Sequence, residues 1–356
     1  MKLTAPPPLK ASAFALLLAT WLVPLQAQDA VPETTPVEAT AAAVAAPLAD
    51  SAPLAVSVKA GHVADLADYG KTVVVPTAYV KFLVDGSIFV AKQTSGLLTL
   101  GGGSGNSVKA KAKYKVAGLD KALAQQIAKR AYDDFVAGLR AAGYTVLTYD
   151  DIKSRDYVAS ASRARADDDW GLPTESAVGS RDTYVVAAPS DEMAFKIGFT
   201  GPFAEFISMG KPKFNDATLV IPIYTITAPQ SASETGGGFN RISAEVSVMP
   251  NMNLSSAQAL WMGKPQVRMG GSIAGVVTQG PTLNLTEKAG ELVKASDTTP
   301  TAANALSKTL SMFGGGSISS SSADYVLNID REVYTAAALR GIGGFNTEVA
   351  KAVAGQ

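Results

Sequence analysis

The clearest pattern in the chain is helical and lies in residues 119–142. Apolar residues recur there every four positions, the spacing that gathers side chains on one face of a helix. They are Leu119, Leu123, Ile127, Ala131, Phe135 and Leu139. Asp120 stands where a helix N-cap is expected, and Gly143 where a left-handed residue ends a helix. Residues 144–149 then read as a strand, which predicts a helix packed on a sheet with Phe135 on its inner face.

Most other apolar segments have the composition and length of strands. Residues 71–84, broken at Pro76, and residues 87–91 are rich in Val and in aromatic residues. Residues 217–228 are apolar on both alternating faces, as in a strand covered on each side. Residues 241–249 alternate apolar and polar, as in an antiparallel strand with one wet face. The remaining predicted strands are residues 184–188, 257–278 (one or two strands) and 324–334.

The segments between these strands complete the predicted fold. Residues 153–180 read as an exposed polar loop. Residues 229–240 carry three consecutive glycines and suit a long hairpin connection. We expect residues 283–313 to be helical in places and residues 346–353 to form a short closing helix. The pattern therefore predicts an α+β fold: a mixed, largely antiparallel β-sheet flanked by helices, with a long Gly-rich hairpin.

The N-terminus has the pattern of an export signal. Lys2 and Lys10 precede an apolar run over residues 11–25, and Leu25-Gln26-Ala27 fits the cleavage position of signal peptidase. The run is shorter than the roughly 20 residues of a membrane-spanning helix, and Pro24 interrupts it. We predict a signal peptide over residues 1–27, a disordered Ala/Pro-rich tether over residues 28–60, and a single large α/β domain over residues 61–356. A subdivision of that domain near residue 180 or 280 stays open. The expected location is the periplasm or the outer membrane surface.

Composition narrows the set of partners. The chain has 31 basic and 31 acidic residues, and cleavage removes Lys2 and Lys10, which leaves 29 against 31 and a net charge of −2. This balance predicts no attraction to nucleic acid. The chain has no Cys, which excludes a lipid-bearing Cys, disulfides and thiolate metal sites. No segment after the signal is apolar over the ~18 residues of a membrane helix. We therefore expect a protein partner in the envelope, and self-association stays open.

Nucleophilic and metal chemistry find little support in the motifs. A Ser-His-Asp triad would have to use His62, the single His, yet the chain has no G-x-S-x-G elbow. Ser272 comes nearest, but Ala274 replaces the second glycine. One His without Cys cannot bind zinc. The run Asp167-Asp168-Asp169 with Glu175 lacks the alternation of a calcium loop, so we interpret it as a solvated loop.

Two Gly-rich segments also fail as phosphate-binding loops. Gly70-Lys71-Thr72 imitates the end of a P-loop, but Asp65 replaces the required glycine and a strand pattern follows. The cluster from Gly101 to Gly105 misses the last glycine of G-x-G-x-x-G. We therefore predict no cofactor.

Paired carboxylates are the remaining acid–base candidates. Asp133-Asp134 falls on the wet face of the predicted helix, and Asp150-Asp151 ends a predicted strand. Both pairs have structural explanations, and no catalytic residue is assigned.

The order of elements resembles a family of envelope proteins. The resemblance covers residues 72–248 and rests on the helix-to-strand signature Phe135-x-x-x-Leu139-x-x-x-Gly143-Tyr144-x-Val146, followed by residues 221–227 joined through a Gly-rich stretch to residues 241–248. This order is similar to that of the family that includes the curli secretion channel and the lipoprotein activator of penicillin-binding proteins. The resemblance implies a mixed sheet with flanking helices in the cell envelope. Family members are typically lipoproteins, whereas this chain lacks Cys.

Three functions follow from these patterns. The first is an exported, non-enzymatic envelope protein that acts in assembly or partner binding. The second is a subunit that contributes strands to an outer-membrane secretion assembly, using residues 241–249 and 257–278. The third is a hydrolase that uses acidic residues only.

Overall fold

The computed structural model describes residues 56–61, 70–93, 107–176, 181–196, 217–236, 243–262, 275–297 and 318–354. The chain divides into two units, residues 1–48 and 49–356, and all the described ranges belong to the second. The predicted signal peptide and most of the tether lie outside the described residues. Residues 58–60, which composition assigns to the tether, belong to a strand, so regular structure begins by Val58.

Thirteen of the described strands form one mixed, largely antiparallel sheet, as the sequence predicts. Its main path runs β1-β12-β11-β8-β3-β4-β15-β14, and β9 and β10 pair separately. The strands are β1 (Val58–Gly61), β2 (Thr72–Val75), β3 (Tyr79–Gln93), β4 (Ser107–Ala117), β5 (Thr145–Thr148), β6 (Thr174–Ser176), β7 (Thr183–Ala187), β8 (Thr218–Thr227), β9 (Gln230–Gly236), β10 (Ser243–Met249), β11 (Asn251–Met262), β12 (Gly275–Gln279), β13 (Leu283–Lys288), β14 (Gly290–Asp297) and β15 (Ile318–Ile329).

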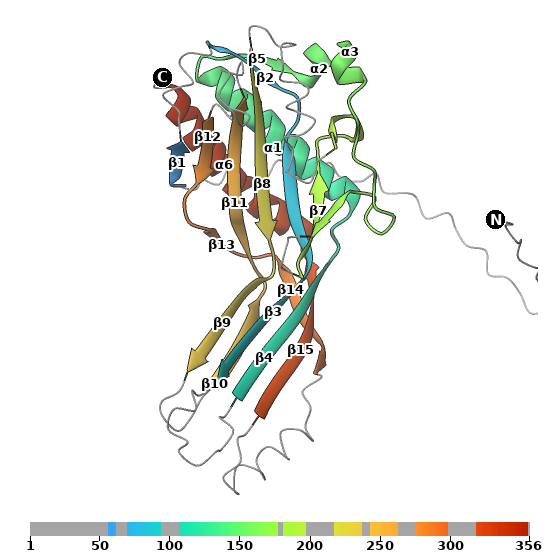
Figure 1. Ribbon diagram of the computed structural model, residues 1–356, viewed down its shortest axis with the longest axis vertical. Coiled ribbons are helices and arrows are strands. Elements are labelled where there is room, and N and C mark those ends of the chain that lie inside the picture. Colours follow the sequence, from blue (N-terminus) through green and yellow to red (C-terminus); the bar gives the residue numbers. More distant parts are fainter. Residues whose placement is uncertain are drawn as a thin grey trace, which may run out of the picture. The chain divides into compact units, whose positions relative to one another are not determined.

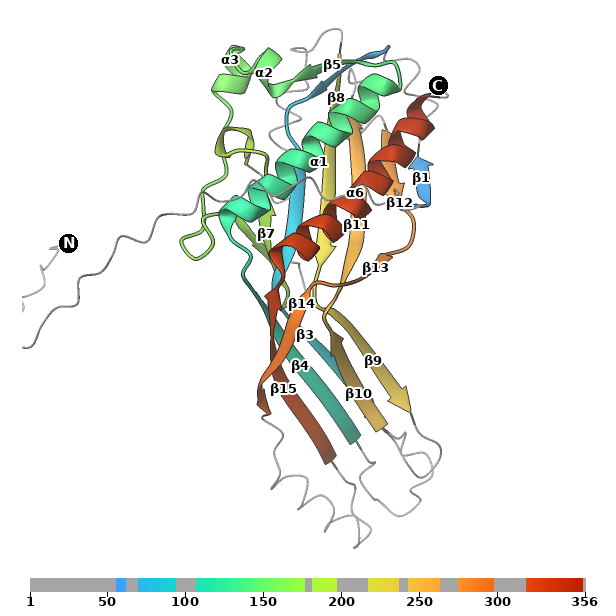
Figure 2. The same ribbon diagram turned by 180° about the vertical axis from the view of Figure 1, so that it is seen from behind.

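Two long helices, α1 (Lys121–Ala141) and α6 (Arg331–Ala354), lie side by side on one face of this sheet (Figure 2). The short helices α2 (Tyr149–Ile152) and α3 (Asp156–Ala159) follow β5. A single 3-10 turn spans Asp191–Met193. No helix in the described ranges combines the length and apolar character needed to cross a bilayer.

Helix α1 confirms the predicted phase. Its buried face includes Leu123, Ile127, Phe135 and Leu139. The Asp120 carboxylate accepts a hydrogen bond of 2.8 Å from the backbone N–H of Leu123, which is the predicted N-cap. Gly143 has a φ of +86°, the left-handed conformation that stops a helix at low cost only for glycine.

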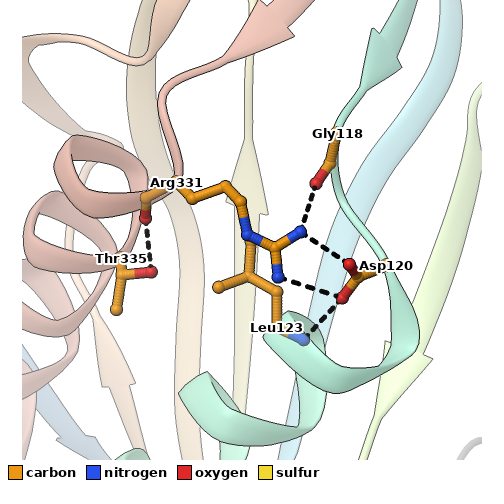
Figure 3. Close-up of polar contacts among 5 residues, drawn as sticks. All are labelled: Gly118, Asp120, Leu123, Arg331 and Thr335. Atoms are coloured by element: carbon orange, nitrogen blue, oxygen red, sulfur yellow. Dashed lines mark hydrogen bonds and ion pairs between the residues drawn. The ribbon is translucent and has the colours of Figure 1, made fainter. Parts of the chain in front are cut away.

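Asp120 also joins the starts of the two long helices (Figure 3). The Arg331 guanidinium at the start of α6 donates to both carboxylate oxygens of Asp120, the shorter contact being 2.6 Å. It donates in addition to the backbone carbonyl of Gly118. The hydrogen bond from Arg331 and that from the Leu123 N–H hold the pKa of Asp120 below its ordinary value.

This lowered pKa predicts a pH-dependent contribution to stability. Because the folded-state pKa of Asp120 lies below the unfolded value of about 3.9, its contribution is present above that value and is lost as pH falls through the folded pKa. The Asp120 side chain is 52% exposed, so we expect Asp120→Asn, which keeps a capping oxygen, to cost under about 1 kcal/mol at pH 7. Urea unfolding of both proteins across pH 7 to 2 measures this. A difference that does not shrink in acid would contradict the assignment.

A buried polar network holds α6 against α1 and β8. The Tyr224 hydroxyl on β8 donates to Oδ1 of Asn346 on α6 at 2.7 Å. Nδ2 of Asn346 donates to Asp134 on α1 at 2.8 Å. Tyr224 is fully buried, and Asn346 is 3% exposed. The network therefore fixes how the two helices sit on the sheet.

The structure corrects three predictions in the second half of the chain. Residues 283–297, expected to be helical in places, form β13 and β14, because pairing with β11 and β15 outweighs their helix-favouring Glu, Lys and Ala residues. Helix α6 begins at Arg331, not near residue 346, and the Asp330 carboxylate accepts from the Glu332 and Val333 N–H groups at its start. The expected connection over residues 229–240 contains β9, which pairs with β10, while β8 pairs with β11.

The exposed loop predicted for residues 153–180 also contains short elements. These are α3 and β6, and β6 pairs with β7 at the edge of the sheet.

Several strands continue past the helices and form a separate extension (Figure 1). We use this name for residues 86–93 of β3, 107–115 of β4, 293–297 of β14, 318–326 of β15, and the hairpin β9–β10. Near its start β3 pairs with β7 and β8, whereas beyond Asp85 its described partner is β4. β15 runs parallel to β4 and antiparallel to β14.

Candidate functional site

Some of the residues that the sequence analysis tested as candidates for catalysis or ligand binding are not described by the structure. His62, Ser272 and the cluster from Gly101 to Gly105 lie outside the described residues. Gly70 and Lys71 are followed by β2, so the strand predicted after Gly70-Lys71-Thr72 is confirmed. The Lys71 ammonium lies 4.7 Å from the centre of the Tyr144 ring, a cation–π contact.

The acidic run Asp167-Asp168-Asp169 forms a local turn. Asp167 accepts hydrogen bonds from the backbone N–H of Asp169 at 3.0 Å and from the Thr174 hydroxyl at 3.0 Å. Glu175 is instead ion-paired with Lys81 of β3 at 2.7 Å. Within the described ranges, no group of three or more His, Asp or Glu side chains is arranged to hold a metal ion.

One member of each predicted carboxylate pair lines the same cavity. Asp133 on α1 and Asp150 on α2 both line an open cavity of about 410 Å³, together with Arg140 and Glu192. Asp150 is the second residue of α2, whereas the sequence predicted the end of a strand there. Asp133 and Asp150 line the same cavity because α1 packs beside the segment that follows β5. Their spacing in the sequence does not predict this.

The carboxylates at this cavity behave as surface ion pairs. Asp133 pairs with Lys129 at 2.6 Å and Asp150 with Lys153 at 2.7 Å, and their side chains are 54% and 80% exposed. Asp151 instead accepts from the Thr148 backbone and hydroxyl, which lower its pKa. An acid–base pair usually needs one carboxyl in an environment that favours its protonated form. The geometry therefore favours a structural role for these residues.

The extension carries a second and more distinctive feature. Lys109, Lys111, Lys113 and Lys115 occupy alternate positions of β4 and share one face of the strand. We call these four residues the lysine row. Ala110, Ala112 and Tyr114, on the opposite face of β4, are buried.

The hairpin β9–β10 packs on the buried face of β4. The Tyr114 side chain hydrogen-bonds Ser231 of β9, and burial raises the pKa of Tyr114 to about 12. Gly86 of β3 lies directly opposite Tyr114, and a Cβ there would come within 2.6 Å of the Tyr114 ring. A side chain at position 86 would therefore displace the Tyr114 ring or the Asp182 carboxylate from its place. With one face covered in this way, the lysine row lies on the other.

An open depression of about 580 Å³ lies at the base of the lysine row. Its lining includes Lys113 and Lys115, the acids Asp85 and Asp324, and Arg181. Asp85 and Lys115 are cross-strand partners whose charged atoms lie 3.6 Å apart. The depression therefore has mixed charge.

Large apolar side chains are also exposed on the extension and its base. Among the described residues, three such side chains are clearly exposed: Phe89 at 59%, Val293 at 42% and Met249 at 38%. Phe89 lies on β3, opposite Lys111 of β4. Val293 lies on β14, and Met249 is the last residue of β10. Their restriction to these strands separates this region from the body, where large apolar side chains are covered.

Sequence reasoning missed the lysine row, although its signal is visible. Residues 107–115 read SVKAKAKYK, a strict alternation of lysine with small or aromatic residues. Such a pattern predicts a strand with one charged and one covered face.

Comparison with known proteins gives no relative for this chain. No family model, no curated protein and no solved structure matches it.

Proposed function

We propose that this chain is an exported, non-enzymatic protein of the cell envelope that acts in assembly or partner binding, located in the periplasm or at the outer membrane. The observation that carries the proposal is the extension, with the exposed apolar side chains Phe89, Val293 and Met249 on it and at its base. The signal-like pattern of residues 1–27 supports export.

The edge strand β14 is the element best suited to a protein partner. β14 ends the described strand order of the sheet and pairs there with β15. A strand at the end of a sheet is the place where a strand of another chain can add. Val293 near the middle of β14 is 42% exposed. Edge strands add strands from other chains through backbone hydrogen bonds, and exposed apolar side chains add affinity.

A second candidate is a subunit that contributes strands to an outer-membrane secretion assembly, as the family resemblance implies. The arrangement of β9–β10 beside β3, β4 and β15 favours it, because these strands leave the body in the same direction (Figures 1 and 2). Among the described residues of the two segments expected to contribute, those that lie in the extension are residues 243–249. β11 pairs with β8 on one side and with β12 and β13 on the other, so it has no open edge to offer over most of its length.

Fractionation of cells that make the protein tests both candidates. We expect recovery with the envelope, an intact mass that begins at Gln28, release by carbonate without detergent, and a particle larger than one chain. Val293→Lys, which places a charge on the edge strand, reduces that particle size. Gln126→Lys, on the exposed face of α1, is the matched control and leaves the size unchanged.

The outcomes separate the two candidates. A ring-sized particle released only by detergent favours the secretion assembly. A chain that stays cytoplasmic with residues 1–27 attached, or a monomer under every condition without a crosslinked partner, overturns the proposal.

A further inference from the structure

The lysine row concentrates like charge along one line. Cα atoms two residues apart on a strand are about 6.6 Å apart, so the row extends about 20 Å. Lys109, Lys113 and Lys115 are exposed, and Lys111 is half-buried. No ion pair among the described residues involves Lys109, Lys111 or Lys113. Neighbouring ammonium groups repel one another, so a ligand that brings negative charge relieves this repulsion.

The positions of β3 and β15 that are in register with the lysine row carry no Lys or Arg. In register with the row, β3 places Asp85 opposite Lys115 and Ser87 opposite Lys113. β15 places Asp324 beside Lys113. Strands in a sheet lie about 4.8 Å apart, so acids stand on both sides of the row near its base. A broad anionic surface would meet these acids, whereas a narrow linear polyanion can follow the row between them.

The spacing of the row selects the kind of polyanion. A polypeptide in extended conformation repeats its side chains on one face every two residues, at the same spacing of about 6.6 Å. Acidic residues at alternate positions therefore meet successive lysines. β4 is paired with β3 and β15 along its length, so the ligand does not add to the sheet at β4 and is bound through side chains. Phe89, opposite Lys111, offers an apolar contact beside the row.

We propose that the lysine row binds an extended polypeptide segment with acidic residues at alternate positions. This inference rests on the proposed function, because it names the chemistry of the envelope partner. It is separate from pairing at the β14 edge, which needs no charge.

Fluorescence anisotropy with the purified protein and synthetic peptides tests the inference. The probe alternates four Glu with Thr, and the comparison peptide has the same composition with its four Glu contiguous. We expect the alternating peptide to bind at least tenfold more tightly than the contiguous one, with affinity falling as salt increases. The double variant Lys111→Gln/Lys113→Gln weakens binding of the alternating peptide at least tenfold. Lys129→Gln/Lys153→Gln removes the same charge from α1 and the segment after α2 and leaves binding unchanged.

Other outcomes overturn the inference. Equal binding of the two peptides, or equal loss in both double variants, shows attraction to net charge alone. Binding to vesicles of anionic lipid, or to an acidic polysaccharide, without binding to the alternating peptide assigns the row to another partner. Circular dichroism confirms that each variant is folded. The particle size measured for Val293→Lys reports on the proposed function independently, so either idea can fail while the other stands.

Discussion

Replacing Phe135 with Ala lowers the free energy of unfolding by about 3 to 5 kcal/mol, because it removes a large buried ring and leaves a cavity. Phe135 is 1% exposed on the inner face of α1, which packs against the sheet and beside α6. Chemical denaturation followed by circular dichroism measures the loss.

The matched control lies two residues away on the same helix. Asp133 forms an i,i+4 ion pair with Lys129 on the exposed face, and pairs of this kind contribute about 0.3 to 0.5 kcal/mol. Asp133→Ala should therefore cost well under 1 kcal/mol. Equal losses for Phe135→Ala and Asp133→Ala would mean that the buried face of α1 is assigned to the wrong residues.

This contrast also shows which parts of the fold are local enough to predict. In α1 the four-residue spacing, the Asp120 cap and the left-handed Gly143 all act within a few residues, and each is found as predicted. The all-apolar pattern of residues 217–228 likewise predicts β8, which is buried on both faces over most of its length.

Elements whose state depends on distant partners were predicted poorly. The six residues of β13 alternate between more and less buried positions, but only Leu283 and Leu285 are apolar, so the strand signal is short and the strand is held by pairing with β11. The parallel pairing of β4 with β15 joins segments about 210 residues apart, and no local pattern encodes it. The extension therefore emerges only from the three-dimensional structure.

The candidate surface shows the same division. The alternation of lysines over residues 107–115 is present in the sequence, and a search for period-2 charge would have found it. The acids that flank the row come from β3 and β15, and the cover on its far side comes from β9. These parts are assembled by topology, so the narrow shape of the positive region was not predictable.

Asn346 illustrates a residue whose importance only the fold reveals. Its amide accepts from the Tyr224 hydroxyl and donates to Asp134, which ties α6 to β8 and α1. Burial raises the pKa of Tyr224 well above its ordinary value, so the hydroxyl remains a donor throughout the neutral range. In the sequence, Asn346 is one polar residue in an Ala- and Gly-rich segment, with no spacing that marks it.

Asn346→Leu should lower the free energy of unfolding by about 2 to 4 kcal/mol, because the Tyr224 hydroxyl is left buried without its acceptor and a hydrogen bond to a carboxylate is lost. Tyr224→Phe alone should cost about 1 to 3 kcal/mol, since the Asn346 oxygen then lacks its donor. The double variant removes both partners, so its loss should be smaller than the sum of the two single losses by about 1 kcal/mol or more. Urea unfolding of the four proteins in this cycle provides the coupling free energy. Strictly additive losses would show that the two side chains contribute through packing alone, and the hydrogen bond would then have no role in seating α6.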